Sequence, residues 1–535
     1  MTPQKGFVRR ILVEPPSLNN NTADAQRLEK CLLNELSTDY IRIPLPVLKK
    51  LPSNLRSWEF KAKAVLFKDR CSWILVDLLN PLSNRSVLGA AVDIGTTRIV
   101  VSLIDLETGF EIVQKGFDNP QAAIGPDVLA RIHYSNQKLG QKSGQKLDQK
   151  FSQTMDQNTG LEELNSLVID SVNFNISALC KEHGFQKEDV YLFTGAGNTA
   201  MTHLFLGIEP IEIIKEPYIP CVNIPDTQPS KNLALDINEN GVAFLFPNIG
   251  SYFGGDLIAG ILFSDLDQKQ APCIMVDVGT NAEIVVGNSD WLIACAGAAG
   301  PALEGGVSKM GMTAKPGVID QVWIDPDSRD LMIHTIDEKK PVGICGSGMI
   351  DLAASLFLSK RIDIRGKFSR QACGKNLFEK DGINYFIIVD KNHSGTGENI
   401  CLSQVDLNSL TSSKAAMYTI LEVIVKNTAG LEFEDLEKFY VAGTFGSFIN
   451  PVSAISIGML PDIPLKTFEV LGNSSLGGAM ELLKNPDAFE RIIKIRQSIT
   501  YIELNVNQEF MNMFSGAKFF PHTDSSRFPS LQNIS

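Results

Sequence analysis

The sequence predicts an α/β protein in which a small first module precedes a larger, two-lobed part. Its 535 residues exceed what one hydrophobic core usually organises, so two or more domains are expected. From residue 87 onward, apolar strands alternate with glycine-rich turns and amphipathic helices, which is the order of elements in α/β proteins. One strand–turn–strand pattern also occurs twice in that part, which indicates a duplicated architecture.

The elements of the first module follow one another closely. Residues 1–24 are expected to form an extended linker segment with a Pro-Pro pair, and Asp24 can cap the helix that follows. That helix, AQRLEKCLLNEL, places leucines and a cysteine on one face, and the stretches YIRIPL, KAKAVLF and CSWILVDLL have the pattern of strands. We therefore predict a small α/β middle domain over residues 25–86.

The larger part, residues 87–535, is expected to fold as two lobes, approximately 87–270 and 271–535. A segment inside the first lobe repeats glutamine at every fourth position from Gln137 to Gln157. Because two glycines weaken a helix over this repeat, we predict a solvated surface insertion there.

Charge and cysteine content exclude several classes of function. A net charge of −12 argues against nonspecific binding to nucleic acid or to anionic membranes. The N-terminus lacks a signal-peptide core, and no stretch approaches the roughly 18 apolar residues that a membrane helix needs. The nine cysteines are scattered without a CxxC pair, which is typical of reduced thiols in a cytoplasmic protein. Their spacing also lacks the common iron–sulfur ligand motifs, so no such cluster is expected in this chain.

The first of the two repeated hairpins lies in AAVDIGTTRIVVSLIDLETG, residues 90–109. An otherwise apolar strand ends in Asp93, and a turn with Gly95, Thr96 and Thr97 leads directly into the next strand. Glycine permits close approach of the backbone, and the amide and hydroxyl groups of such a turn can surround a phosphate. Asp93 can hold Mg²⁺ through water. Taken alone, this stretch is explained more simply as an ordinary β-hairpin.

The second hairpin, APCIMVDVGTNAEIVVGN, repeats the arrangement with Asp277, Gly279, Thr280 and Asn281. The two copies are expected to face each other and to clamp the β- and γ-phosphates of a nucleotide. A third element, KFYVAGTFGSFINP, is a strand that enters a glycine-rich turn before a helix. That turn suits the base and ribose side of a nucleotide, although a plain helix entry is the competing explanation.

These three elements in this order resemble the actin-like ATPase superfamily. Longer segments narrow the resemblance to the reductive activators of corrinoid proteins, over essentially the whole chain. The segments are NPQAAIGPDVLARI, FTGAGNTAMTHLFLGIEP, AGPALEGGVSKMGMTAKPGVID, GICGSGMID, VAGTFGSFINPVSAISIGMLPDIP and ELNVNQEFMNMFSGAKFFPHTDSSRFPS. The resemblance implies an actin-like (ribonuclease H-like) two-lobed ATPase core that follows a small middle domain, with ATP and Mg²⁺ as cofactors.

Individual residues receive expected roles from these patterns. Asp93 and Asp277 are the expected Mg²⁺ ligands and catalytic carboxylates. Glu304, in GPALEGG, is a candidate general base for the attacking water, and a carboxylate favoured by a helix N-terminus is an equal alternative. Phosphate contacts are expected from the hairpin turns and adenosine contacts from the third element, namely Gly95, Thr96, Thr97, Gly279, Thr280 and Asn281, then Gly443 and Gly446.

The family that the chain resembles returns an oxidised corrinoid cofactor from Co(II) to Co(I) with a low-potential electron and ATP hydrolysis. The resemblance therefore implies activation of the corrinoid protein of a methyltransferase system, and it makes a homodimer plausible. Those activators commonly carry an iron–sulfur domain ahead of the linker, whereas this chain begins at the linker. Three explanations stay open: a separate ferredoxin-like electron donor, a truncated form, or the loss of redox work.

Two other functions fit the same motifs. A small-molecule kinase of the actin-like superfamily would need a substrate pocket with a catalytic carboxylate between its lobes. A nucleotide-gated binding module would hold a corrinoid protein without forming Co(I). ATP turnover stimulated by a corrinoid protein distinguishes the activator from the kinase, and Co(I) formation with an electron donor distinguishes it from the binding module.

Overall fold

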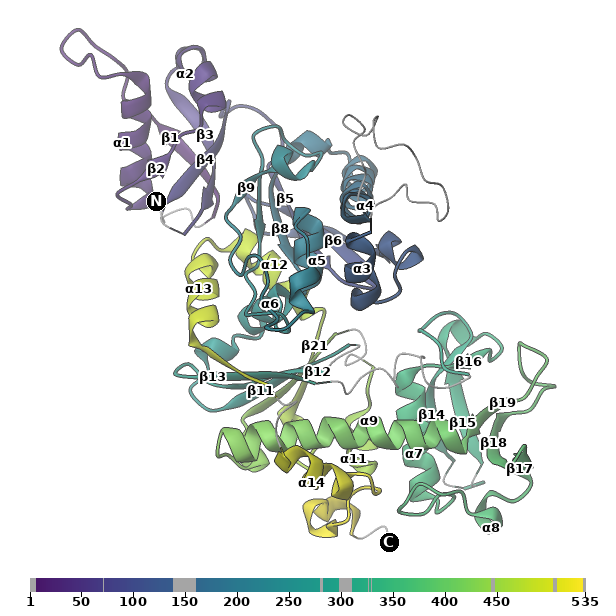
Figure 1. Cartoon of the computed structure of the whole chain (residues 1–535). Helices are drawn as coiled ribbons and strands as arrows, with labels where there is room; N and C mark the ends of the chain where they lie inside the picture. Colours follow the sequence, from purple (N-terminus) through teal and green to yellow (C-terminus); the bar gives the residue numbers. More distant parts are fainter. Residues whose placement is uncertain are drawn as a thin grey trace, which may run out of the picture. The chain divides into compact units, whose positions relative to one another are not determined.

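The computed structural model describes residues 6–70, 72–137, 160–279, 282–297, 310–325, 327–328, 330–443, 448–503 and 508–532. The chain divides into two compact units (Figure 1). The first unit comprises Met1–Phe263 and Ser474–Gln497, and the second comprises Ser264–Asn473 and Ser498–Ser535. The chain thus returns to the first unit late in the sequence. The boundaries predicted for the middle domain, 25–86, and for the lobes, 87–270 and 271–535, stay predictions. The predicted glutamine-rich insertion lies outside the described residues after Gln137.

The first module is a four-stranded sheet with two helices. In spatial order its strands are β1 (Val8–Leu12), β3 (Lys61–Lys68), β4 (Trp73–Leu79) and β2 (Ile41–Arg42), and its helices are α1 (Asp24–Leu36) and α2 (Leu45–Ser57). β1 lies inside the segment expected to be a linker, and it joins the sheet because Phe7, Val8 and Ile11 are buried. Asp24 lies in the first turn of α1 and does not cap it, since Ala23 is the N-cap residue.

A six-stranded mixed sheet forms the centre of the first unit. Its spatial order is β7 (Glu111–Asp118), β6 (Arg98–Asp105), β5 (Leu88–Ile94), β8 (Val190–Ala196), β10 (Val242–Leu245) and β9 (Gln228–Pro229). β7, β6 and β5 form an antiparallel meander, whereas β5, β8 and β10 are parallel. β8 is buried along its whole length, as expected for a parallel strand inside a sheet.

Helices from distant parts of the chain cover this sheet. They are α3 (Val128–Ser135), α4 (Gly160–Glu182), α5 (Thr199–Leu206), α6 (Gly255–Ser264), α12 (Ser474–Lys484) and α13 (Ala488–Ser498). In Figure 1, the yellow α12 lies beside the strands β5 and β8, which come much earlier in the chain. The hydroxyl of Thr194 in β8 donates to the Ala479 carbonyl at 2.9 Å and fixes that packing.

The second unit contains a sheet with the same internal order. Its strands are β21 (Phe468–Gly472), β20 (Lys438–Ala442), β11 (Cys273–Val278), β12 (Ala282–Gly287), β13 (Leu292–Gly297) and β22 (Ile499–Glu503). β11, β12 and β13 form an antiparallel meander, and β20 and β21 run parallel to β11. Each sheet therefore has three antiparallel strands followed by two parallel ones, which confirms the duplication that the sequence predicted.

The rest of the second unit surrounds one large hydrophobic core. Two three-stranded sheets contribute β14 (Val318–Ile324), β15 (Leu331–Thr335) and β16 (Gly343–Ile344), then β17 (Leu377–Lys380), β18 (Ile383–Val389) and β19 (Ile400–Ser403). The helices are α7 (Gly346–Leu358), α8 (Arg370–Cys373), α9 (Gln404–Glu422), α11 (Pro451–Ser456) and α14 (Gln508–Ala517). Within the part of the chain that the structure describes, no helix combines the length and apolar character needed to cross a membrane.

A buried lysine of α9 holds the C-terminal segment. The Lys414 ammonium group is fully buried and donates to the carbonyl oxygens of Phe519 and Pro521, the latter at 2.7 Å. Burial lowers the pKa of Lys414 well below its usual value. His522 follows directly, and its Nδ1 accepts from the Asp524 backbone N–H at 3.0 Å. The conspicuous FFPHTDSS stretch therefore packs and anchors the end of the chain.

Candidate functional site

Asp93 lies one residue before the end of β5, at the point where the strand meets the predicted phosphate turn. In the sheet it is opposite Val100 of β6 and Ala196 of β8. Its neighbours along the strand are buried, whereas Asp93 itself is only partly buried. The Ser475 hydroxyl, in the first turn of α12, donates to Asp93 Oδ1 at 2.9 Å. The carboxylate is thus oriented by a helix that enters from the far end of the chain.

The turn that follows has all three of its carbonyl oxygens held by other groups. The Asn119 side chain donates to Gly95 O at 2.9 Å, and its backbone N–H donates to Thr97 O at 2.9 Å. Between them, Arg131 donates to Thr96 O at 2.7 Å. A Cβ on Gly95 would lie 2.1 Å from the Arg98 carbonyl oxygen, so only glycine fits there. A turn held in this way can present its amide groups and threonine hydroxyls to a phosphate.

Asn198 connects the same turn to the start of α5. Its side-chain Oδ1 caps the helix by accepting from Met201 N at 2.9 Å, and its Nδ2 donates to Thr96 Oγ1 at 2.9 Å. Since Thr96 Oγ1 accepts this bond, its own hydroxyl proton can donate to a ligand. Gly254 packs directly on Asn198: a Cβ on it would lie 2.4 Å from Asn198 Cα and 2.5 Å from Asp256 Oδ1. This close packing brings a further carboxylate, Asp256 in the first turn of α6, to the same loops.

The second hairpin has its own glycine contact. Asp277 in β11 is opposite Ala442 of β20, and Gly443 follows at once with a φ of +82°. A Cβ on Gly443 would lie 2.5 Å from Asp277 Oδ1 and 3.1 Å from the Val278 carbonyl oxygen. Gly443, expected on the adenosine side, is therefore in contact with the predicted magnesium ligand. Its place beside adenosine stays a prediction.

Several predicted site residues lie outside the described residues. They are Thr280 and Asn281 of the second turn, Glu304 and Gly446. Gly279 is described and directly follows β11, as expected. The roles of these residues remain predictions.

Four polar residues around the first hairpin were not singled out as site residues from the sequence. They are Asn119, Arg131, Asn198 and Ser475. The first three lie in the segments NPQAAIGPDVLARI and FTGAGNTAMTHLFLGIEP, which carried the family resemblance. The sequence therefore marked these segments but did not indicate what the three side chains do. Ser475 had only the helix-start pattern of NSSLGGAM, and its contact with Asp93 spans 382 residues of sequence.

The oxygen donors at the two hairpins suit Mg²⁺. Among the described residues, no group of three or more His, Cys, Asp or Glu side chains is placed to hold a metal ion by itself. Mg²⁺ is commonly bound through one or two carboxylates while it keeps several waters and contacts substrate phosphates. A single aspartate at the end of each central strand fits that mode.

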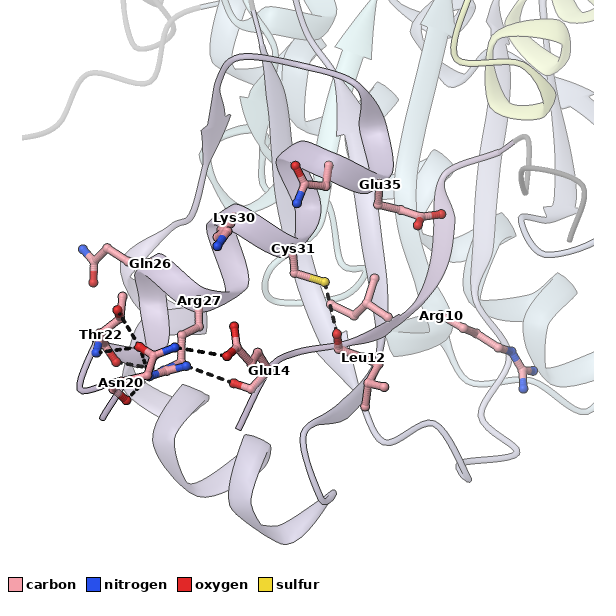
Figure 2. A pocket seen from close by; sticks show the side chains of 12 residues that line it. Arg10, Leu12, Glu14, Asn20, Thr22, Gln26, Arg27, Lys30, Cys31 and Glu35 are labelled. Atoms are coloured by element: carbon pink, nitrogen blue, oxygen red, sulfur yellow. Dashed lines mark hydrogen bonds between the residues drawn. The ribbon is translucent and has the colours of Figure 1, made fainter. Parts of the chain in front are cut away.

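A separate pocket of about 440 Å³ lies between β1 and α1 of the first module (Figure 2). Its most buried cation, Arg27, is occupied by the chain itself, because it donates to Thr22 O at 2.9 Å and also to carbonyl oxygens of Glu14 and Asn20. The Cys31 thiol is directed to Leu12 O at 3.5 Å. Acidic and basic side chains mix in its lining, and the pocket contains none of the predicted phosphate-binding residues.

Comparison with known families places the two units in a defined class. A model described as the C-terminal domain of RACo, the ASKHA domain, matches residues 271–532. The RACo middle region matches residues 88–159 and 142–269, and the RACo linker region matches residues 8–80. The chain therefore has the ASKHA, or actin-like, fold that the sequence predicted.

Individual relatives define the family more closely. The chain is 31% identical over 437 residues to the corrinoid activation enzyme RamQ of Eubacterium limosum, covering 80% of this chain and 70% of that protein. A solved structure of a reductive activator for corrinoid, iron-sulfur protein matches with a TM-score of 0.82 and 34% identity, covering 98% of this chain and 81% of that one. A [Co(II) methylated amine-specific corrinoid protein] reductase of Methanosarcina barkeri is 28% identical over 290 residues, or 50% of this chain and 49% of that protein. The chain belongs to the RACo family of corrinoid-protein activators.

Proposed function

We propose that this protein uses ATP to activate the corrinoid protein of a methyltransferase system by returning its cofactor from Co(II) to Co(I). The observation that carries the proposal is the family match along nearly the whole chain, together with the paired aspartate hairpins. One electron passes from a donor to Co(II), and ATP is hydrolysed. We further propose that a separate ferredoxin-like protein supplies the electron and that the activator works as a homodimer.

Each residue of the hairpins has a defined task in this proposal. Asp93 and Asp277 would hold Mg²⁺ through water, and Thr96 and Thr97 would donate to phosphate oxygens. Mg²⁺-ATP supplies the hydrolysis, in which water attacks the γ-phosphorus and the bond to the β-phosphate oxygen breaks. The Ser475 hydroxyl donates to Asp93 Oδ1 and so fixes the orientation of the carboxylate. Thr280, Asn281 and Glu304 keep their sequence-based roles as phosphate contacts and general base.

The free energy needed to reduce Co(II) to Co(I) can come from binding to the partner that depends on ATP. For one electron, about 59 mV corresponds to roughly 1.4 kcal/mol. Allosteric coupling between two sites is typically about 1–3 kcal/mol, which offsets on the order of 100 mV. A nucleotide-dependent difference in affinity for the Co(II) form of the partner is therefore sufficient to assist an uphill reduction, without phosphorylation of any group.

The test is a spectroscopic assay of Co(I) formation. The protein is mixed with a corrinoid methyltransfer protein in its Co(II) form, reduced ferredoxin and Mg²⁺-ATP, and each component is omitted in turn. We expect Co(I) only when ATP, the donor and this protein are all present, and ATP turnover stimulated by the corrinoid protein. Turnover with a sugar or an acid instead would support the kinase alternative, and tight binding without Co(I) would support the binding module.

Aspartate variants connect this activity to the hairpins. Asp93→Asn and Asp277→Asn are each expected to lower ATP turnover about 100-fold or more, because charge stabilisation at a phosphoryl group is lost. Asp170→Asn, at an exposed position on α4, is the matched control and should change turnover less than about twofold. The predicted action of both hairpins on one nucleotide requires the losses to be non-additive in the double variant. Additive losses would contradict it.

A further inference from the structure

We propose that Arg131 is a positioning residue for nucleotide phosphates, which acts by fixing the Thr96 carbonyl on the far side of the phosphate turn. This inference rests on the proposed function, because it concerns the same hairpin. Arg131 touches no nucleotide in this proposal. Its effect passes through the backbone of the turn: in a trans peptide unit, the Thr97 N–H points opposite to the Thr96 carbonyl that Arg131 holds.

The bonding of Arg131 is unusual for a buried charge. Its side chain is fully buried in α3, and among the described residues it forms no ion pair with a carboxylate. Its guanidinium donates to Gly125 O at 2.9 Å, to Gln121 Oε1 at 3.1 Å and to Thr96 O at 2.7 Å, and it contacts Met201 Sδ at 3.3 Å. Burial lowers its pKa to about 10, so it remains charged at neutral pH. The charge is thus used to bind three oxygen atoms and one sulfur atom rather than to neutralise an acid.

These partners lie in the phosphate turn itself and in two segments next to it. Gln121 lies in the 3-10 turn Pro120–Ala123, whose N-cap residue Asn119 holds the other two carbonyls of the turn. Met201 lies in α5, whose N-cap residue Asn198 holds the Thr96 hydroxyl. Arg131 is therefore the common partner of the elements that contact Thr96 from both sides. A planar guanidinium can bridge such partners, whereas a lysine ammonium is a point charge and cannot keep the same set of bonds.

A purely structural role makes a different prediction. If Arg131 only stabilises the core, its replacement lowers stability. The affinity of the folded variant for ATP and for adenosine then either stays at the wild-type value or falls by the same factor for both ligands. If it positions the turn, the loss depends on the phosphates of the ligand. Adenosine and ATP share the base and ribose and differ in phosphates, so their affinities separate the two roles.

The experiment uses Arg131→Lys in the full chain, with Arg131→Met as a second variant. Binding of ATP and of adenosine is measured by calorimetry, steady-state ATP turnover is measured in parallel, and urea unfolding reports stability. We expect Arg131→Lys to weaken ATP binding and raise KM for ATP about 10-fold, while adenosine binding changes less than twofold and kcat changes less than threefold. Arg131→Met should show the same selectivity with a larger loss.

The matched control is Arg27→Lys in the first module. Arg27 is also a buried arginine that donates to backbone carbonyl oxygens, and it is not part of the hairpin. We expect Arg27→Lys to lower stability comparably and to leave ATP affinity unchanged. Two results would overturn the Arg131 proposal alone, provided that the wild-type protein binds ATP. In the first, folded Arg131→Lys binds ATP as tightly as wild type does; in the second, it loses affinity for adenosine and ATP equally. A wild-type protein that does not bind ATP would overturn the proposed function and this inference with it.

Discussion

The two sheets have the same internal strand order, and among the described residues different kinds of contact surround the hairpins at their centres. The first hairpin depends on side chains from elsewhere: Asn119, Arg131 and Asn198 hold its turn, and Ser475 orients Asp93. In the second, the backbone of Gly443 approaches the carboxylate of Asp277 directly. In both, the aspartate is opposite an alanine of a parallel strand, Ala196 or Ala442, and a glycine follows that alanine.

The difference shows which part of a duplicated fold is constrained. The sheet order and the position of the aspartate are common to both copies, because a carboxylate at the end of a central strand is placed by strand pairing. The described supporting contacts of the first hairpin come from the helices and loops attached to that copy. We therefore expect variants of the shared geometry to have the largest effects and variants of the local supports to have smaller ones.

After the two aspartate variants, Gly443→Ala is expected to have the largest effect, because it changes the shared geometry in the second copy. The added methyl group would lie 2.5 Å from Asp277 Oδ1, and φ is +82°, so both the carboxylate and the backbone must move. We expect ATP turnover to fall about 100-fold, with a higher Mg²⁺ concentration needed for half-maximal rate. Turnover measured against Mg²⁺ concentration checks this.

The control is Gly430→Ala in the same unit. Gly430 has a similar φ of +67°, but a Cβ there would meet nothing within 4 Å. The Gly430→Ala variant has the strain of a positive φ but no close contact for the added methyl group. Its ATP turnover should therefore stay within about twofold of wild type. An equal loss in both variants would attribute the effect to strain and contradict the role of the Asp277 contact.

Lys414→Met tests whether a buried cation stabilises the second unit. Lys414 holds backbone carbonyl oxygens there, as Arg131 holds the Thr96 carbonyl in the first hairpin. The substitution leaves the carbonyl oxygens of Phe519 and Pro521 without their buried donor. We expect the free energy of unfolding to fall by about 2–4 kcal/mol, because each unsatisfied buried group costs roughly 1–3 kcal/mol and removal of a desolvated charge offsets part of it. Urea unfolding measures this, and Lys466→Met, at an exposed position, should change it by less than about 0.5 kcal/mol. Wild-type stability in Lys414→Met would refute the anchoring role.

Local patterns in the sequence were sufficient to predict both hairpins, the aspartates at their strand ends and the duplication, because strand alternation and turn composition are short-range signals. The supports were not predictable in the same way. Arg131 lies in an amphipathic helix where a buried arginine has no distinct pattern, and Ser475 meets Asp93 only through the folding of α12 onto β5. β1 was missed as a sheet strand because its partner β3 lies far along the chain. Long-range contacts of this kind depend on tertiary structure, which one sequence does not display.

Ser475→Ala tests a local support of the first hairpin. The change removes the hydroxyl that donates to Asp93 Oδ1 at 2.9 Å. Hydrogen bonds to charged groups contribute about 1.5–3 kcal/mol, so we expect kcat/KM for ATP to fall roughly 10-fold. Ser474→Ala is the matched control: its buried Oγ has no hydrogen-bond partner among the described residues, and its removal should be close to neutral. Equal kcat/KM values for the two variants would contradict a role for Ser475.

The smallest expected effect is a pH dependence that belongs to the second unit alone. Burial, followed by the charges of Arg527 and Lys414, lowers the pKa of His522 from 6.5 to about 4, and Asp524 opposes the shift. Because the unfolded chain binds the proton more readily, the stabilisation is complete above about pH 6.5 and declines as the pH falls toward 4. His522→Gln should flatten this slope in urea midpoints measured between pH 7.5 and 4.5, with a smaller change than Lys414→Met causes at neutral pH. ATP affinity should not change with either substitution, since the described contacts of His522, with Tyr418 and Asp524, lie in the C-terminal anchor. An unchanged slope in His522→Gln would assign the acid sensitivity to other groups.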